Sequence, residues 1–116
     1  MYLNKLEKQV IQRFLDDKCL DLIKRNINFD LININYREFT GGGFLTELKR
    51  CDELKVTHTT QSYRWGKVGA KLNSNFDTDY LIYVDNGYLD AIEGCSYGKG
   101  WPDEVNQIEI YEMIFS

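Results

Sequence analysis

Residues 79–93, DYLIYVDNGYLDAIE, decide the fold. Apolar and polar side chains alternate before and after Asn86-Gly87, and an Asn-Gly pair between two such runs is typical of a β-hairpin closed by a two-residue type I′ turn. This turn fixes the register, because Asp85 then faces Tyr88. The stretch therefore predicts two neighbouring antiparallel strands.

The predicted register assigns the hairpin residues to two faces of a sheet. The expected pairs are Val84–Leu89, Ile82–Ala91 and Tyr80–Glu93 on one face, and Tyr83–Asp90 and Leu81–Ile92 on the other. The first face is expected to look inward. A carboxylate there needs a partner. We therefore expect Glu93 to accept a hydrogen bond from Tyr80 or from a glycine-rich backbone segment, unless it reaches water at the strand end.

Four further segments have strand patterns. Residues 29–39, 44–49 and 67–72 alternate with a period of two. Residues 107–115 are apolar on both sides after Ile110, which is typical of a central strand. Residues 51–66 are polar and weakly periodic, so we interpret them as the longest irregular connection and as a natural place for a functional loop.

The N-terminal quarter has a helical pattern instead. Apolar residues between Leu3 and Leu15 recur every three or four positions, as in an amphipathic helix. Asp16-Asp17 interrupts this pattern, and it restarts at Cys19. The restart predicts a second short helix or, alternatively, one kinked helix.

The 116-residue chain fits one domain with one buried core. We expect an α+β fold over residues 1–116, with a helix or helix pair (3–27) packed on a mainly antiparallel sheet of about five to six strands (29–115). No apolar run is long enough to span a bilayer, and the first residues lack the apolar block of a secretory signal. A cytoplasmic protein that begins at Met1 is therefore expected.

Charge is unevenly distributed along the chain. Residues 1–72 hold 13 Lys and Arg against 9 Asp and Glu, whereas residues 73–116 hold 1 against 9, for a net charge of −4. An acidic half disfavours nucleic acid, because phosphates need cations to replace their counterions. It favours a basic partner surface. The solvated outer face of a sheet is an equally good explanation of the same charges.

The glycine-rich stretch EFTGGGFLTEL, residues 38–48, does not have the pattern of a phosphate-binding loop. Such a loop lies between a strand and a helix and ends in a further motif such as Gly-Lys-Ser/Thr. Here a strand pattern follows the glycines. We therefore expect a turn, a β-bulge or a close backbone approach.

Candidate catalytic and metal-binding residues are sparse. His58 is the only histidine, and no metal-ligand spacing accompanies it, so no metal or cofactor is expected. Cys19, Cys51 and Cys95 have no paired spacing and are expected to be reduced. A nucleophilic pair of Cys51 or Cys95 with His58 lacks a supporting motif. A small hydrolase or ligand-binding domain that uses Glu93 with Tyr80 or His58 remains the enzymatic alternative.

Two loops carry large aromatic residues. Tyr97 and Trp101 follow the hairpin, and Tyr63 and Trp65 precede it. These residue types often anchor protein interfaces. Capping of the two ends of the core by the tryptophans is the alternative interpretation.

Two motifs together resemble a pattern in small, uncharacterised bacterial proteins. They are Phe39-Thr-Gly-Gly-Gly-Phe-Leu-Thr46 and Ile92-Glu-Gly-Cys-Ser-Tyr-Gly-Lys-Gly-Trp-Pro102. The resemblance implies a compact α+β fold and assigns no catalytic residues. In size, charge and composition the chain is also similar to immunity proteins, which neutralise bacterial toxins.

We therefore expect a non-enzymatic cytoplasmic binding protein, most plausibly an immunity protein. Its partner would be a basic protein surface such as a toxin domain, and neither nucleic acid nor membrane. The residues expected to bind the partner are Asp77, Asp79, Asp90, Glu93, Tyr97, Trp101 and Trp65. The third hypothesis is a homo-oligomer, for example a homodimer, whose subunits pair through strand edges or tyrosine-rich faces.

Overall fold

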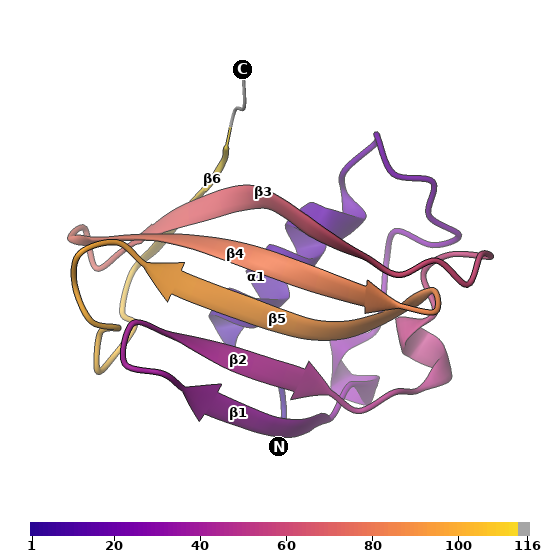
Figure 1. Ribbon diagram of the computed structural model, residues 1–116, viewed down its shortest axis with the longest axis horizontal. Coiled ribbons are helices and arrows are strands. Elements are labelled where there is room, and N and C mark those ends of the chain that lie inside the picture. The colour runs from indigo at the N-terminus through magenta and orange to yellow at the C-terminus, as the bar shows by residue number, and fades with distance from the viewer. Residues whose placement is uncertain (114–116) are drawn as a thin grey trace.

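The computed structural model of the protein describes residues 1–113. Within these residues one α-helix packs on one face of a six-stranded sheet, which confirms the predicted α+β fold (Figure 1). The strands lie in the order β1-β2-β5-β4-β3-β6, and all neighbours are antiparallel. The elements are α1 (Lys5–Leu15), β1 (Ile34–Phe39), β2 (Gly43–Leu48), β3 (Tyr63–Leu72), β4 (Phe76–Asp85), β5 (Tyr88–Ser96), β6 (Ile108–Glu112) and the short 3-10 helices η1 (Phe29–Leu31) and η2 (Asp52–Leu54).

Helix α1 begins with a capping box. The side chain of Asn4 accepts a hydrogen bond from the Glu7 N–H, and the Glu7 carboxylate accepts one from the Asn4 N–H, both at 2.9 Å. The Glu7 side chain is fully buried, and it also accepts hydrogen bonds from Arg37 of β1 and Thr46 of β2. This network fixes the start of the helix over the β1–β2 pair, and an apolar stripe packs the rest of it on the sheet: Leu6, Val10, Ile11, Phe14 and Leu15.

Residues 16–28 form no helix, so the prediction of a second helix is wrong. Arg25 donates hydrogen bonds to three carbonyl oxygens, those of Leu15, Asp17 and Leu20. It thereby satisfies an acceptor that the end of α1 leaves open. The Ile23 N–H donates to the Val56 carbonyl at 2.8 Å. These backbone groups are already hydrogen-bonded through tertiary contacts, so a short helix would add little hydrogen-bond energy to the segment.

The sheet has one buried and one uncovered face. Along β4 every second side chain, from Thr78 to Val84, is buried on the side of α1, which we call the helix face. The alternate side chains point the other way, where no element of residues 1–113 lies over the sheet: Figure 1 looks onto this side, with α1 behind the strands. We call it the open face, and its outward residues are Tyr36, Glu38, Leu45, Glu47, Arg64, Gly69, Lys71, Asp77, Asp79, Leu81, Tyr83, Asp90, Ala91, Glu93, Cys95, Glu109 and Tyr111.

The predicted β4–β5 hairpin is confirmed. Asn86 and Gly87 have φ angles of 50° and 84°, as a type I′ turn requires. The two residue pairs next to the turn are also those predicted.

Farther from the turn the predicted register is wrong, because Asp90 forms a β-bulge. One extra residue on β5 shifts every later pair, which become Tyr83–Ala91, Ile82–Ile92 and Leu81–Glu93. The shift buries Ile92 completely and moves Glu93 to the open face. Glu93 therefore pairs with Leu81. Simple alternation had predicted a pair with Tyr80.

Two predicted strand boundaries and the predicted position of the last strand also differ. β3 begins at Tyr63, so the end of segment 51–66 belongs to the sheet, and β1 begins only at Ile34, after η1. β6 is an edge strand, so the prediction of a central strand is wrong; residues 114–116 lie outside the described part. The apolar character of both sides of β6 has another cause. Ile110 faces the core, while Tyr111 covers Gly69 on the open face.

The three glycines form the β1–β2 turn. Gly41 has a φ of 81°, and Gly43 lies so close to β5 that an added Cβ would be 1.9 Å from a carbonyl oxygen. The turn also holds the loop after β5, because the Ser96 N–H donates to Gly42 at 2.8 Å and the Trp101 N–H to Gly41 at 2.9 Å. The two glycine-rich motifs of the sequence therefore meet in space.

Candidate protein-binding face

The open face brings together the four acidic residues predicted to bind a partner. Asp77 and Asp79 come from β4, and Asp90 and Glu93 come from β5. Asp77, Asp79 and Asp90 reach this face by simple alternation, whereas the β-bulge at Asp90 directs Glu93 to it. The result is a set of carboxylates on two adjacent central strands.

Carboxylates outnumber cations over the whole open face. In addition to the four predicted acids, this side carries Glu38, Glu47 and Glu109 and, near the hairpin turn, Asp85. Two of the cations near them form exposed ion pairs, Lys71 with Asp77 (3.8 Å), and Arg50 with Asp85 (2.7 Å) and with Asp90 (3.6 Å), and a third, the exposed Arg64, lies opposite Tyr83. Exposed pairs of this kind are weak. A basic partner surface can therefore compete for these carboxylates.

Asp79 lies in a cluster with two tyrosines. The Tyr97 hydroxyl donates a hydrogen bond to Asp79 Oδ2, and this bond, together with partial burial, raises the pKa of Tyr97 to about 12. The ring of Tyr111 lies over Gly69, where an added Cβ would be 2.9 Å from a ring carbon. Tyr97 is 55% and Tyr111 41% exposed. The cluster thus presents a carboxylate between two accessible aromatic rings, which can attract a cation.

Glu93 lies at the centre of the face. Its carboxylate accepts a hydrogen bond from the Tyr83 hydroxyl at 3.0 Å, and its cross-strand neighbours are Leu45 and Leu81. Burial, followed by the interaction with Glu93, raises the pKa of Tyr83. Half-buried leucines therefore flank a hydrogen-bonded acid at the centre of the face.

The two tryptophans do not lie with these acids. Trp65 is only 5% exposed on the helix face, in edge-to-face contact with Phe14 at 5.4 Å between ring centroids. Trp101 is half-buried on the same side, against Phe44 and Tyr80. Trp65 thus fits the core-capping interpretation.

Two exposed tyrosines of the open face were missed by the sequence analysis. Tyr36 of β1 and Tyr111 of β6 are each 41% exposed. They lie on the two edge strands, at opposite ends of the strand order. Alternation alone could show that each points away from the core, but only the strand order reveals that they border the same acidic face.

The residues of the enzymatic alternative do not converge. Glu93 lies on the open face, Tyr80 is buried on the helix face, and His58 is exposed in the β2–β3 connection. His58 shares a cavity with Cys19 and with neither Cys51 nor Cys95. Within residues 1–113, no group of three or more His, Cys, Asp or Glu could hold a metal ion.

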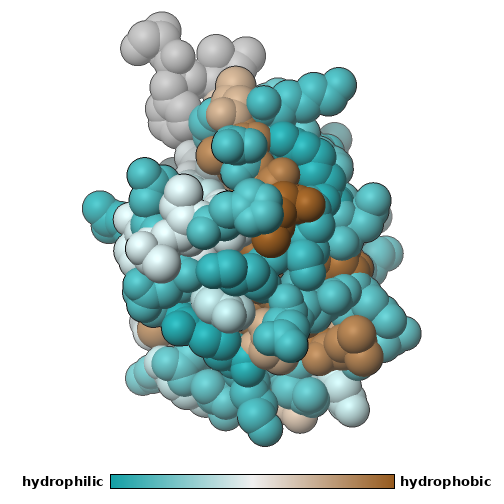
Figure 2. All heavy atoms as spheres, turned by 90° about the vertical axis from the view of Figure 1, so that its right-hand side faces the viewer, coloured by the Kyte–Doolittle hydropathy of each residue, from teal (hydrophilic) through white to brown (hydrophobic). Residues whose placement is uncertain are grey.

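The end of the molecule that carries the β4–β5 turn shows no large apolar patch. Figure 2 views this end, which is mainly hydrophilic with hydrophobic side chains in small, separate patches. This view offers no apolar surface that would compete with the open face as a docking site.

Comparison of the chain with protein-family models, with curated proteins and with solved structures finds no match. None of the helices in the described part has both the length and the apolar character to cross a membrane. Function is therefore inferred from the geometry and charge of the molecule.

Proposed function

We propose that the protein is a non-enzymatic binding protein whose open face docks on a basic surface of a partner protein. The observation that carries this proposal is the shared outward position of Asp77, Asp79, Asp90 and Glu93 beside exposed tyrosines, on a sheet face that no element of residues 1–113 covers. A sheet face with half-buried leucines and more carboxylates than cations is complementary in chemistry to a surface of Lys, Arg and apolar side chains.

The dimensions of the molecule support docking over this face. It measures 39 × 36 Å across and 20 Å through. A broad face of this size exceeds the roughly 800 Å² per partner that a standard protein interface buries. Tyrosines, which are enriched at binding hot spots, would supply contact area while the carboxylates speed association and select the partner.

The partner class that we propose is a bacterial toxin domain with a basic surface, which the protein would neutralise in the cytoplasm by covering it. Small size, acidic charge and a flat binding face support this class. Occlusion of a basic functional surface needs only complementary charge and shape, so no catalytic residue is required.

The test is affinity capture from cells of the source organism with matched baits. One bait carries Asp79→Lys with Glu93→Lys on the open face. The control carries Asp21→Lys with Asp30→Lys, an equal change of charge at exposed positions on segments of the helix face. We expect the wild type and the control to recover the same protein. Its affinity for the open-face variant should be lower by on the order of tenfold or more, since like charges would then face each other.

Three outcomes would contradict the proposal. One is equal recovery with both variants, and another is wild-type recovery that does not weaken as salt increases, because surface electrostatics are screened. The third is recovery of only a second copy of the chain, which would favour the homo-oligomer. In every case circular dichroism should first show that the variants are folded.

A further inference from the structure

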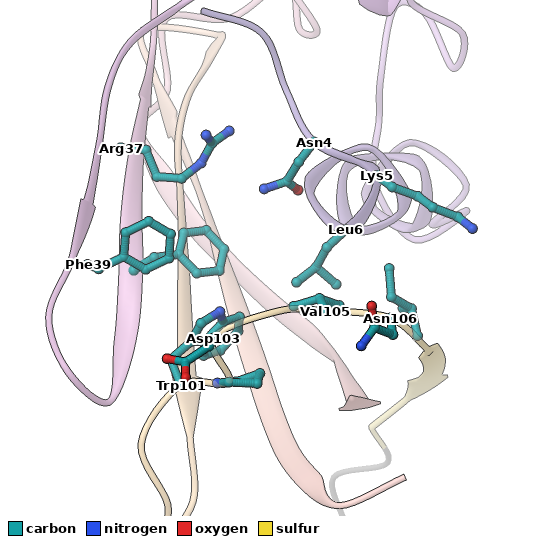
Figure 3. Close-up of a pocket in the computed structure, with 12 residues that line it drawn as sticks. Asn4, Lys5, Leu6, Arg37, Phe39, Trp101, Asp103, Val105 and Asn106 are labelled. Carbon is teal, nitrogen blue, oxygen red and sulfur yellow. The ribbon is translucent and has the colours of Figure 1, made fainter. Parts of the chain in front are cut away.

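A second site lies on the helix face, on the opposite side of the sheet from the open face. It is a cavity of about 320 Å³ between the start of α1, β1 and the loop that follows β5 (Figure 3). This volume lies at the lower end of the range for small-molecule pockets. The cavity therefore fits one ring system and little more.

The walls of this cavity are apolar and already in place. Phe39, Phe44 and Trp101 form an aromatic side, while Leu6 and Val105 form an aliphatic side opposite (Figure 3). Trp101 is held by its hydrogen bond to Gly41 and by its edge-to-face contact with Phe44, with 5.1 Å between ring centroids. Such a slot suits a flat apolar group, because aromatic rings stack or meet edge to face with little reorganisation.

The polar groups at the mouth of the cavity are mostly unused donors. The Asn4 oxygen is occupied by the Glu7 N–H, which leaves the Asn4 amide nitrogen, and Arg37 binds Glu7 through Nε and Nη2, which leaves Nη1 with only a sulfur contact. Within residues 1–113, Lys5 Nζ and Trp101 Nε1 have no hydrogen-bond acceptor. Asp103 is the one carboxylate among the lining residues. Donors thus prevail over acceptors.

We propose that this cavity binds a small planar aromatic carboxylate. The ring would lie between Trp101 and Val105, and the carboxylate would accept hydrogen bonds from the donors near Asn4 and Arg37. The Lys5 side chain points away from the cavity in Figure 3, but it is exposed, so it would turn toward the bound carboxylate. This inference does not depend on the proposed docking of the open face, because the two sites lie on opposite sides of the sheet.

The test uses 2-naphthoate as the probe and nitrogen-15 NMR as the readout. The protein has two tryptophans, so it gives two indole N–H signals. We expect the Trp101 signal to shift saturably with naphthoate at millimolar concentrations, whereas the signal of Trp65, which is buried and bonded to Asp17, stays fixed. The uncharged 2-naphthylmethanol should bind more weakly, because the ring remains but the carboxylate is lost.

Two variants locate the carboxylate. Lys5→Gln should weaken naphthoate binding by about two- to fivefold, the range of an exposed charge interaction. Lys8→Gln, on the same helix but outside the cavity, should leave it unchanged. Asn4→Ser keeps a residue that caps helices well but removes the amide donor, so it should also weaken binding.

The proposal is wrong if no saturable shift occurs at Trp101, or if both tryptophans respond alike. It is also wrong if the neutral alcohol binds as tightly as naphthoate, or if Lys8→Gln weakens binding as much as Lys5→Gln. Lys5 is exposed and has no protein partner in the described part of the chain, so its substitution tests the site without disturbing the fold.

Discussion

The ionisation of Asp17 is coupled to the fold by three contacts. Its carboxylate accepts hydrogen bonds from the Trp65 indole at 2.8 Å and from the Cys19 N–H at 2.9 Å, and it pairs with Lys67 at 3.1 Å. Burial by itself raises the pKa of Asp17, but these three interactions outweigh it and lower the pKa to about 2. A single acid thus ties the segment after α1 to β3.

The Asp17→Asn variant should lose this coupling. Because the pKa of Asp17 is lower in the folded than in the unfolded state, its contribution is present above pH 4 and disappears as the pH falls toward 2. We expect the substitution to reduce the free energy of unfolding at neutral pH by about 1–2 kcal/mol, with a smaller difference from wild type near pH 2. Urea unfolding at several pH values measures both effects.

The matched control is Asp16→Asn, since Asp16 is exposed and, within residues 1–113, its side chain bonds only to Gln12 of α1. It should change stability much less. A constant difference between wild type and Asp17→Asn from pH 7 to pH 2 would contradict this account of Asp17.

The elements of the sheet depend on close contact between β2 and β5. At Gly43 an added Cβ would lie 1.9 Å from the Gly94 carbonyl oxygen, whereas at Gly42 it would meet no atom within 4 Å. Gly43→Ala should therefore destabilise the protein by about 1–3 kcal/mol or more, the usual cost of overpacking. Gly42→Ala should be nearly neutral. Thermal unfolding of the two variants side by side measures the difference, and equal melting temperatures would contradict the close β2–β5 contact at Gly43.

Sequence patterns predicted the elements that depend on local signals. The Asn86-Gly87 turn, the amphipathic helix and the alternation of the strands are all of this kind, and the structure confirms them. The bulge at Asp90 was missed because the register set by the turn was extended unchanged along β5, although the adjacent apolar residues Ala91 and Ile92 interrupt the alternation there. The prediction of a second helix was wrong for another reason. The Arg25 side chain donates hydrogen bonds to backbone carbonyl groups five to ten residues away, and no local pattern reveals these bonds.

The sequence predicted only those residues of the candidate site whose positions depend on local alternation. Asp77 and Asp79 reach the open face by alternation, whereas Glu93 was assigned to the wrong face because its position depends on the bulge. The place of Tyr111 beside Asp79 follows from the pairing of β3 with the edge strand β6. Pairings between segments distant in sequence are set by the whole fold, so composition alone could not reveal this cluster.

At the scale of the whole molecule, two surfaces with different chemistry lie on opposite sides of one sheet. The open face is broad, acidic and rich in tyrosine, while the cavity near Trp101 is small, aromatic and rich in donors. Binding at one surface can therefore be measured while the other stays free.

The most direct measurement is hydroxyl-radical footprinting of the complex with the partner recovered by capture. The tyrosines give an internal comparison, because Tyr36, Tyr97 and Tyr111 border the open face, whereas Tyr2, which is 64% exposed, lies beside Lys8 and Phe29 on the helix side. The account predicts that the three open-face tyrosines become protected from labelling while Tyr2 stays reactive. Protection of Tyr2 with unchanged labelling of the other three would contradict it.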